Sequence, residues 1–190
     1  MKIWKCVPVT LAAAAALVLA GLTSPAAADG GGGDSGVIRV QDRCDPATFN
    51  AAVGPGTCIP APEGGVVWTK FLAALAANPA GVLAERESRG WRFHETDVTI
   101  RAGQDLVLVN SGGEVHTFTQ VPQYGLGCVP PLNGFFVNLN QPPYAGDCDA
   151  AFATSAVLPG TTIHVKNLAK GSYKFECLVH PWMRTDVTVR

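Results

Sequence analysis

The sequence predicts an all-β protein with a Greek-key β-sandwich fold. Two observations support this prediction. Apolar and polar residues alternate over Val98–Arg101 and again over Thr162–Val165, which is the period of a half-buried strand. Turns that contain glycine separate the predicted strands, at Ala102-Gly103, Ser111–Gly113 and Lys170-Gly171. Short antiparallel strands separated in this way are typical of a sandwich with Greek-key connections.

The N-terminus has the three parts of a secretory signal peptide. Two lysines precede an apolar run from Leu11 to Leu22, and small residues follow it. We expect cleavage after Ala28, so that residues 1–28 form the signal peptide and Cys6 is removed with it. The apolar run is too short to span a bilayer, and no later stretch is longer. We therefore expect a mature protein in the periplasm or outside the cell, without stable membrane insertion.

The chain from residue 29 to residue 65 is expected to be flexible and rich in loops. Residues 29–36 are mostly glycine and are predicted to form a flexible leader. From Val37 onward, proline and glycine are frequent between Cys44 and Cys58. This composition indicates a stapled loop rather than a sheet.

A short helical extension is predicted over residues 66–90. The alanine-rich stretch 69–77 places its large apolar side chains on one helical face and ends before Pro79. A further helical turn is expected over 80–86. We expect this extension to pack on the sandwich.

Residues 91–190 are expected to form the sandwich domain itself. The unbroken apolar run Leu106–Val109 is typical of a strand buried on both faces, and alternating residues over 173–177 and 187–189 provide two more strands. The 162 residues that remain after removal of the signal peptide suit one domain. The net charge of −1 and the absence of a basic run argue against a nucleic-acid partner.

Five cysteines remain after removal of the signal peptide, and four of them can pair in an oxidising compartment. Pairing of Cys44 with Cys58 and of Cys128 with Cys148 is favoured, because each pair brackets a loop rich in proline and glycine. Four cysteines allow three connectivities, and the sequence does not choose among them. One thiol is left unpaired, and metal ligation of Cys177 would account for it.

The most informative motif lies near the C-terminus. Cys177, His180 and Met183 place a thiolate, an imidazole and a thioether within seven residues. His116 follows a glycine-rich strand end and adds a second imidazole. Two histidines, one cysteine and one methionine form the donor set of a mononuclear blue-copper site. The sequence therefore predicts one type 1 copper ion, bound by His116, Cys177, His180 and Met183.

Other metal sites fit the sequence less well. Structural zinc normally takes four Cys or His ligands, whereas the fourth donor here is a thioether. Dinuclear copper centres need two cysteines in the ligand loop and multicopper oxidases carry His-x-His pairs, and the sequence has neither. His94 and His164 are expected to be solvated. Lys174 and Glu176 are expected to form an ordinary exposed sheet face.

Several segments resemble the cupredoxins, in particular those of the plastocyanin and amicyanin type. Val98–Asp105 is similar to the strand before the first ligand, Val115–Thr119 to the first-ligand strand, and Tyr173–Cys177 to the strand that enters the ligand loop. The spacing Cys-x-x-His-x-x-Met looks most like the short loop of amicyanin. The resemblance covers roughly residues 91–190. It implies that His116, Cys177 and His180 form a plane of strong ligands and that Met183 makes a weaker axial contact.

Two features depart from the family pattern. The residue after the first histidine is Thr117, where plastocyanins and amicyanin have Asn, and a hydroxyl is expected to replace the amide in linking this strand to the Cys loop. The connection Gln120–Pro159 is also unusually long. We expect a disulfide to staple it, and we expect it to cover part of the copper site or to form a docking surface.

Together these features predict a non-enzymatic carrier of single electrons between protein partners, expected to be a monomer. A redox partner is expected to dock near His180 and Trp182, where an imidazole edge emerges in an apolar patch. Two alternatives stay open. One is a copper storage, delivery or sensing module without redox turnover, although such proteins often use exposed Met/His-rich segments that this chain lacks. The other is a small copper enzyme with a substrate pocket built by Gln120–Pro159.

Overall fold

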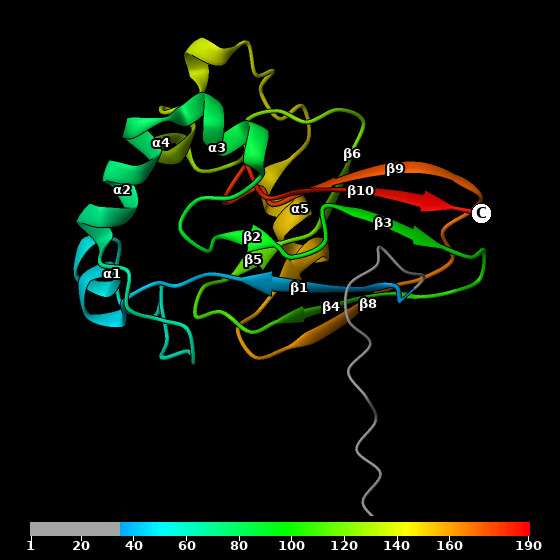
Figure 1. The fold of residues 1–190 in the computed structure, drawn as a ribbon, viewed down its shortest axis with the longest axis horizontal. Helices are drawn as coiled ribbons and strands as arrows, with labels where there is room; N and C mark the ends of the chain where they lie inside the picture. Colours follow the sequence, from blue (N-terminus) through cyan, green and yellow to red (C-terminus); the bar gives the residue numbers. More distant parts are fainter. Residues whose placement is uncertain (1–34) are drawn as a thin grey trace, which may run out of the picture. The chain divides into compact units, whose positions relative to one another are not determined.

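The computed structural model describes residues 35–190, so the predicted signal peptide, Cys6 and nearly all of the glycine-rich leader lie outside the described residues. Within this range the chain forms two four-stranded sheets, a two-stranded pair and several short helices (Figure 1). None of the helices in this range is long and apolar enough to cross a membrane.

The first sheet has the strand order β2-β1-β4-β8. Its inner strand β1 runs parallel to β4, with Ile38 opposite Leu108. Ile38 and Val40 are fully buried between more exposed neighbours. The prediction that the chain from Val37 to Gly65 forms a loop rather than a sheet is therefore wrong for β1, and the sandwich begins well before residue 91. The alternating pattern of this segment contains only two buried apolar residues. The segment forms a strand because it pairs with distant parts of the chain. The bounds are β1 Val37–Gln41, β2 Arg92–Phe93, β4 Leu106–Asn110 and β8 Thr162–Val165.

The second sheet has the order β3-β10-β9-β6. β10 pairs antiparallel with β9 and parallel with β3, where Val187 lies opposite Val98. The expectation of antiparallel strands is thus wrong for β10 and β3, while in the first sheet the parallel pair comes from β1, which the sequence did not predict. Each parallel pair joins strands that are far apart in the sequence, which leaves room for the long connection that parallel pairing needs. The bounds are β3 Asp97–Ile100, β6 Thr119–Val121, β9 Gly171–Glu176 and β10 Arg184–Val189.

The inner faces of the two sheets share one hydrophobic core, as a sandwich requires. Buried residues from both sheets belong to the same cluster, among them Ile38, Leu106, Leu108, Ile100, Phe175 and Val187. β4 is buried on one face only, because Val107 and Val109 are half-buried. The expectation of burial on both faces is therefore wrong for this strand. Greek-key connectivity stays a prediction.

Three helices of the N-terminal part lie at one end of the sheets, away from the C-terminus (Figure 1). The predicted helix over 69–77 corresponds to α2, and the further turn over 80–86 corresponds to α3. Asp45 and Asn78 accept hydrogen bonds from backbone N–H groups in the first turns of α1 and α3, and a proline follows each cap. The bounds are α1 Pro46–Ala52, α2 Trp68–Ala77 and α3 Pro79–Glu85.

The long connection over Gln120–Pro159 contains three short helical elements and is held by a disulfide. It contains α4 (Pro130–Asn133), a 3₁₀ turn η1 (Val137–Leu139), α5 (Cys148–Ser155) and β7 (Ala156–Val157). β7 pairs with β5 (His116–Thr117), and this pairing places His116 opposite Val157. The favoured cysteine pairing is confirmed: Cys44 is joined to Cys58, and Cys128 to Cys148.

Candidate metal centre

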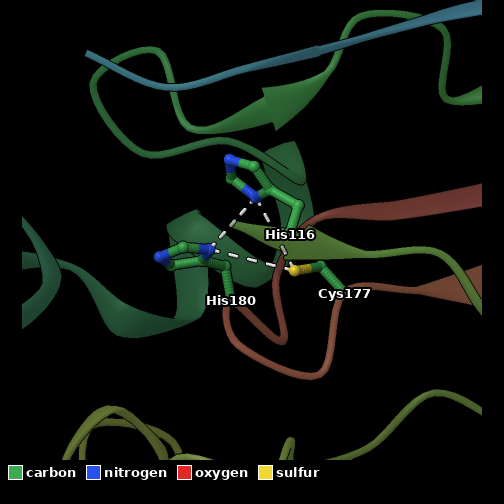
Figure 2. A group of neighbouring side chains, drawn as sticks. All are labelled: His116, Cys177 and His180. Atoms are coloured by element: carbon green, nitrogen blue, oxygen red, sulfur yellow. Dashed lines mark hydrogen bonds between the residues drawn. The ribbon is translucent and has the colours of Figure 1, made fainter. Parts of the chain in front are cut away.

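Three predicted ligands converge at one end of the sandwich (Figure 2). His116 lies on β5, Cys177 follows β9, and His180 lies in the loop before β10. The Cys177 Sγ is 3.7 Å from His116 Nδ1 and 3.8 Å from His180 Nδ1, and the two Nδ1 atoms are 3.3 Å apart. All three residues are at most 1 % exposed. Cys177 carries a free thiol, so its sulfur is available as a ligand.

The loop from Cys177 to Met183 is closed by its own backbone. The Met183 N–H donates to the His180 carbonyl at 2.9 Å, and the Cys177 N–H donates to the Met183 carbonyl at 3.0 Å. Directly after it, Arg184 pairs with Glu176 at the start of the β9–β10 ladder. Met183 is completely buried in this closed loop. Its role as the axial ligand stays a prediction.

Thr117 connects the two segments that carry the ligands. Its hydroxyl accepts a hydrogen bond from the Leu178 N–H at 2.8 Å, and its backbone N–H donates to the Cys177 Sγ at 3.4 Å. The expectation that a hydroxyl joins the first-ligand strand to the Cys loop is confirmed. Since both partners are buried, this bond fixes the position of the sulfur relative to β5.

Asp42 is a close neighbour of the centre that the sequence did not reveal. It follows β1, and its Oδ2 lies 3.0 Å from Nε2 of His116. A histidine that donates through Nε2 keeps the lone pair of Nδ1 free, and this nitrogen faces Cys177. Asp42 lies 74 positions before His116 in the sequence. Only recognition of β1 as an inner strand could have indicated that the two meet.

His180 lies against aromatic rings and a second carboxylate. Its ring is 5.2 Å from that of Trp182 and 6.3 Å from that of Phe71 on α2, and its Nε2 is 3.7 Å from Glu114 Oε2. Glu114 also accepts a hydrogen bond from the indole N–H of Trp91. Glu114 lies two residues before His116, so in an extended chain the two side chains point to the same side. This spacing is the sequence signal that could have identified Glu114.

The expected exposure of His180 and Trp182 is wrong. His180 is 1 % exposed, and Trp182 is fully buried. The Trp182 indole N–H donates to the Trp91 carbonyl at 3.1 Å, and its ring packs on Phe71 and Phe136. The helical extension and the long connection together cover this end of the sandwich. Sequence patterns within the loop cannot show such a cover, because it comes from segments far away in the chain.

The electrostatics of the centre favour an anionic sulfur. Burial alone would raise the pKa of the Cys177 thiol, but hydrogen bonds from His116 and His180 outweigh it and hold this pKa well below its usual value. Burial likewise opposes a charge on His116, yet Asp42 and Cys177 raise its pKa to about 10. For Asp42, burial is outweighed by His116 and by two backbone N–H groups, and its pKa falls to about 2. A metal ion would thus replace a proton held among these groups.

Glu176 is buried, so the expectation of an exposed sheet face is wrong for this residue. Its Oε2 accepts a hydrogen bond from the Gly125 N–H at 3.0 Å and lies 3.7 Å from the Arg184 Nε. Burial raises the pKa of Glu176 to about 8, with Arg184 acting in the opposite direction. Lys174 is exposed over 44 % of its side chain and pairs with Asp186, as an ordinary surface residue does. The long connection had not been expected to cover Glu176.

His94 and His164 lie outside the centre, and the prediction that they are solvated is confirmed. Their side chains are 48 % and 47 % exposed. Each lies beside a surface carboxylate, Glu95 and Asp105 respectively.

The long connection packs directly on the ligand loop. The Cys128 N–H donates to the Leu178 carbonyl at 2.6 Å. A Cβ atom on Gly127 would lie 2.2 Å from the same carbonyl oxygen, so the close approach needs a glycine there. These contacts place the connection against the loop that carries Cys177 and His180, and that it covers a bound copper ion stays a prediction.

The donor set fits copper. Two imidazole nitrogens and one sulfur whose pKa is lowered converge within 3.8 Å of one another, and such a set suits a blue-copper ion. A closed structural zinc site would need a fourth nitrogen, sulfur or carboxylate donor. The nearby carboxylates of Asp42 and Glu114 face the Nε2 side of the histidines, away from the converging atoms.

No protein-family model matches the chain, and no curated protein matches it. Among solved structures, it is similar to a purple cupredoxin from Nitrosopumilus maritimus, with 17 % identity, 53 % of this chain and 83 % of that chain covered, and a TM-score of 0.34. It is similar to a variant of amicyanin in its reduced Cu(I) form, with 15 % identity, 53 % and 74 % covered, and a TM-score of 0.34. A copper-containing nitrite reductase from Thermus scotoductus matches at 15 % identity over 52 % of this chain and 20 % of that chain, with a TM-score of 0.32. The neighbours of this chain among solved structures thus include cupredoxins, the family that its motifs resemble.

Proposed function

We propose that this chain is an exported type 1 copper protein that carries single electrons between protein partners. The observation that supports the proposal best is the buried convergence of the His116 and His180 Nδ1 atoms with the Cys177 sulfur. Met183 is the proposed axial ligand from the same loop. When bound, copper would supply a one-electron couple, because thiolate and thioether favour Cu(I) whereas imidazole suits both oxidation states.

The residues around the ligands are arranged to prevent movement. Thr117 joins the two ligand segments, Asp42 holds the His116 ring, and backbone bonds close the loop. Side chains held in this way keep the same positions when the charge of a bound ion changes. Small rearrangement of the ligands is what rapid electron exchange requires.

Two observations favour an electron carrier over the alternatives. Delivery of copper to another protein requires ligands that an acceptor can reach, whereas these are at most 1 % exposed. A copper enzyme needs a substrate cavity that reaches the metal. The cavity of about 300 Å³ beside the long connection is lined by residues such as Gln120, Tyr144 and Glu176, and by none of the proposed ligands.

We place the docking of the redox partner at the His180 end, with α2 as the contact layer. The Phe71 ring lies between His180 and Trp68, at 6.3 Å and 5.6 Å. Trp68 is half-buried and therefore reaches the surface. The proposal keeps the predicted location near His180 and Trp182 but assigns the contact to the helix that covers them.

Copper loading of the mature protein tests the site directly. We expect an intense blue absorption from the thiolate–Cu(II) bond and reversible one-electron reduction. Cys177→Ser removes the thiolate and should abolish the colour while the two disulfides remain intact. Retention of the blue band in Cys177→Ser would refute the proposed ligand set.

Met183→Leu tests the axial assignment separately. Loss of a weak thioether donor should preserve the blue colour and raise the reduction potential, because Cu(II) loses more stabilisation than Cu(I). Redox titration of both proteins measures the difference. An unchanged potential would mean that Met183 is a packing residue only.

A further inference from the structure

The carboxylate of Asp42 is surrounded by hydrogen-bond donors. Its two oxygens accept from the backbone N–H groups of Cys44 at 3.3 Å, Gly113 at 3.0 Å and Glu114 at 3.0 Å, and from Nε2 of His116 at 3.0 Å. The side chain is completely buried. A carboxyl group that accepts four hydrogen bonds and donates none is ionised.

The chain around Asp42 is shaped to admit this carboxylate. A Cβ atom on Gly112 would lie 1.9 Å from Asp42 Oδ2, and one on Gly113 would lie 2.9 Å from the Cys44 sulfur. The loop before His116 can therefore wrap Asp42 only because it has glycine at both positions. The disulfide between Cys44 and Cys58 fixes the chain directly after Asp42.

The negative charge of Asp42 is not offset by a lysine or arginine. Among residues 35–190, the ion pair formed by Asp42 is with His116 alone. A buried charge acts over short distances with little screening, so it stabilises a neighbouring cation more strongly than a surface charge does. Cu(II) carries one more positive charge than Cu(I), and the carboxylate should favour the oxidised form.

We propose that Asp42 is a positioning residue of the copper site, which holds His116 with its proton on Nε2 and its Nδ1 toward Cys177, and which lowers the reduction potential. This inference rests on the proposed function. It assigns a role in the site to the N-terminal segment, because β1 ends one residue before Asp42.

The first test compares two variants of the copper-loaded protein. Asp42→Asn removes the buried charge with little change of volume, and Glu63→Gln removes an exposed charge from the same segment. We expect Asp42→Asn to raise the potential by at least about 59 mV, which corresponds to a tenfold shift in the ratio of Cu(I) to Cu(II) affinity. Glu63→Gln should leave the potential nearly unchanged. Equal shifts in the two variants would overturn the proposal.

The second test uses the unaltered protein and does not depend on folding of a variant. Cu(I) is diamagnetic, so nitrogen NMR of the Cu(I)-loaded protein can locate the proton of His116. We expect it on Nε2, hydrogen-bonded to Asp42. A metal-bound or unprotonated Nε2 would overturn the proposal. Absence of any reversible couple in the unaltered protein would refute the proposed function itself, and the inference about Asp42 with it.

Discussion

Two segments stapled by disulfides enclose the metal centre, and they act on it differently. The N-terminal segment, residues 37–90, contains the Cys44–Cys58 disulfide and contacts the side chains of both histidines. Asp42 contacts His116, and Phe71 contacts His180. The long connection, held by Cys128–Cys148, contacts the residues between the ligands, at Leu178 and Trp182, and meets His116 through the backbone pairing of β7 with β5. We infer that the first segment sets the electronic properties of the site and the second mainly its stability.

Trp182→Ala should have the largest effect on stability, because both segments meet at this side chain. Its ring contacts Phe71 of the first segment and Phe136 of the second. We expect a loss of about 3–5 kcal/mol in the free energy of unfolding, since a large buried ring is replaced by a cavity. Urea unfolding measures it, and Trp68→Ala, at a half-buried position, should cost less. A loss as small as that of Trp68→Ala would show that the two segments do not depend on Trp182.

Removal of each disulfide separates the two roles most directly. The double variants Cys44→Ser/Cys58→Ser and Cys128→Ser/Cys148→Ser open loops of similar length, with separations of 14 and 20 residues. Each should lose about 3 kcal/mol of stability by the chain-entropy argument. Only the first should also change the reduction potential, because Cys44 donates to Asp42. A larger potential shift in the second variant would reverse the comparison.

Thr117→Val tests the hydrogen bond that joins β5 to the loop that carries Cys177 and His180, beneath the two covering segments. The substitution preserves shape but leaves the buried Leu178 N–H without its acceptor. We expect a loss of about 1–3 kcal/mol in the free energy of unfolding. Thr117→Ser keeps the hydroxyl and should therefore retain most of the stability that Thr117→Val loses. If Ser and Val destabilise equally, the methyl group matters rather than the hydrogen bond.

Arg86→Met should have the smallest effect and should depend on pH. Arg86 follows α3 and pairs with Asp186 of β10 at 2.8 Å, so it ties the first segment to the sandwich. Burial acts against the charge of Asp186, but Lys174 and Arg86 outweigh it and lower its pKa. A carboxyl group whose pKa is lower in the folded protein than in the unfolded chain stabilises the fold at pH values above the unfolded pKa. This stabilisation is lost as the pH falls through the folded pKa.

We therefore expect Arg86→Met to lose about 1 kcal/mol at pH 7, because the Arg86–Asp186 pair is only partly buried. The difference from the unaltered protein should begin to shrink below about pH 4, the ordinary pKa of an aspartate in the unfolded chain, and disappear as the pH falls through the lowered pKa of folded Asp186. Thermal unfolding at several pH values measures it. A difference that grows on acidification would mean that another group carries the effect.

The sequence was sufficient for the parts of the site that are local. Cys177 and His180 lie in one short loop, and the two-residue period of the strands before them determines which side chains face inward. The link from Thr117 to this loop joins positions 61 residues apart, and it was expected from the resemblance to cupredoxins rather than from a local pattern. The cysteine count correctly left one free thiol among the described residues, that of Cys177.

The sequence was insufficient where partners come from distant segments. β1 is a strand because it inserts beside β4, and its own pattern of two buried residues is too short to reveal that. Asp42 and the cover over Trp182 depend on this insertion and on the helices that follow it. For the same reason Glu176 was assigned to the surface, although a loop some fifty positions earlier covers it.

The complete burial of the ligands has a consequence for the kinetics of metal uptake. Copper cannot reach Cys177 or His180 while both covers are closed, since each is at most 1 % exposed. Uptake and release should therefore proceed at the rate at which one cover opens locally, or before the chain has finished folding. A protein of this kind would take up its ion slowly and keep it for a long time, whatever the equilibrium affinity of the site.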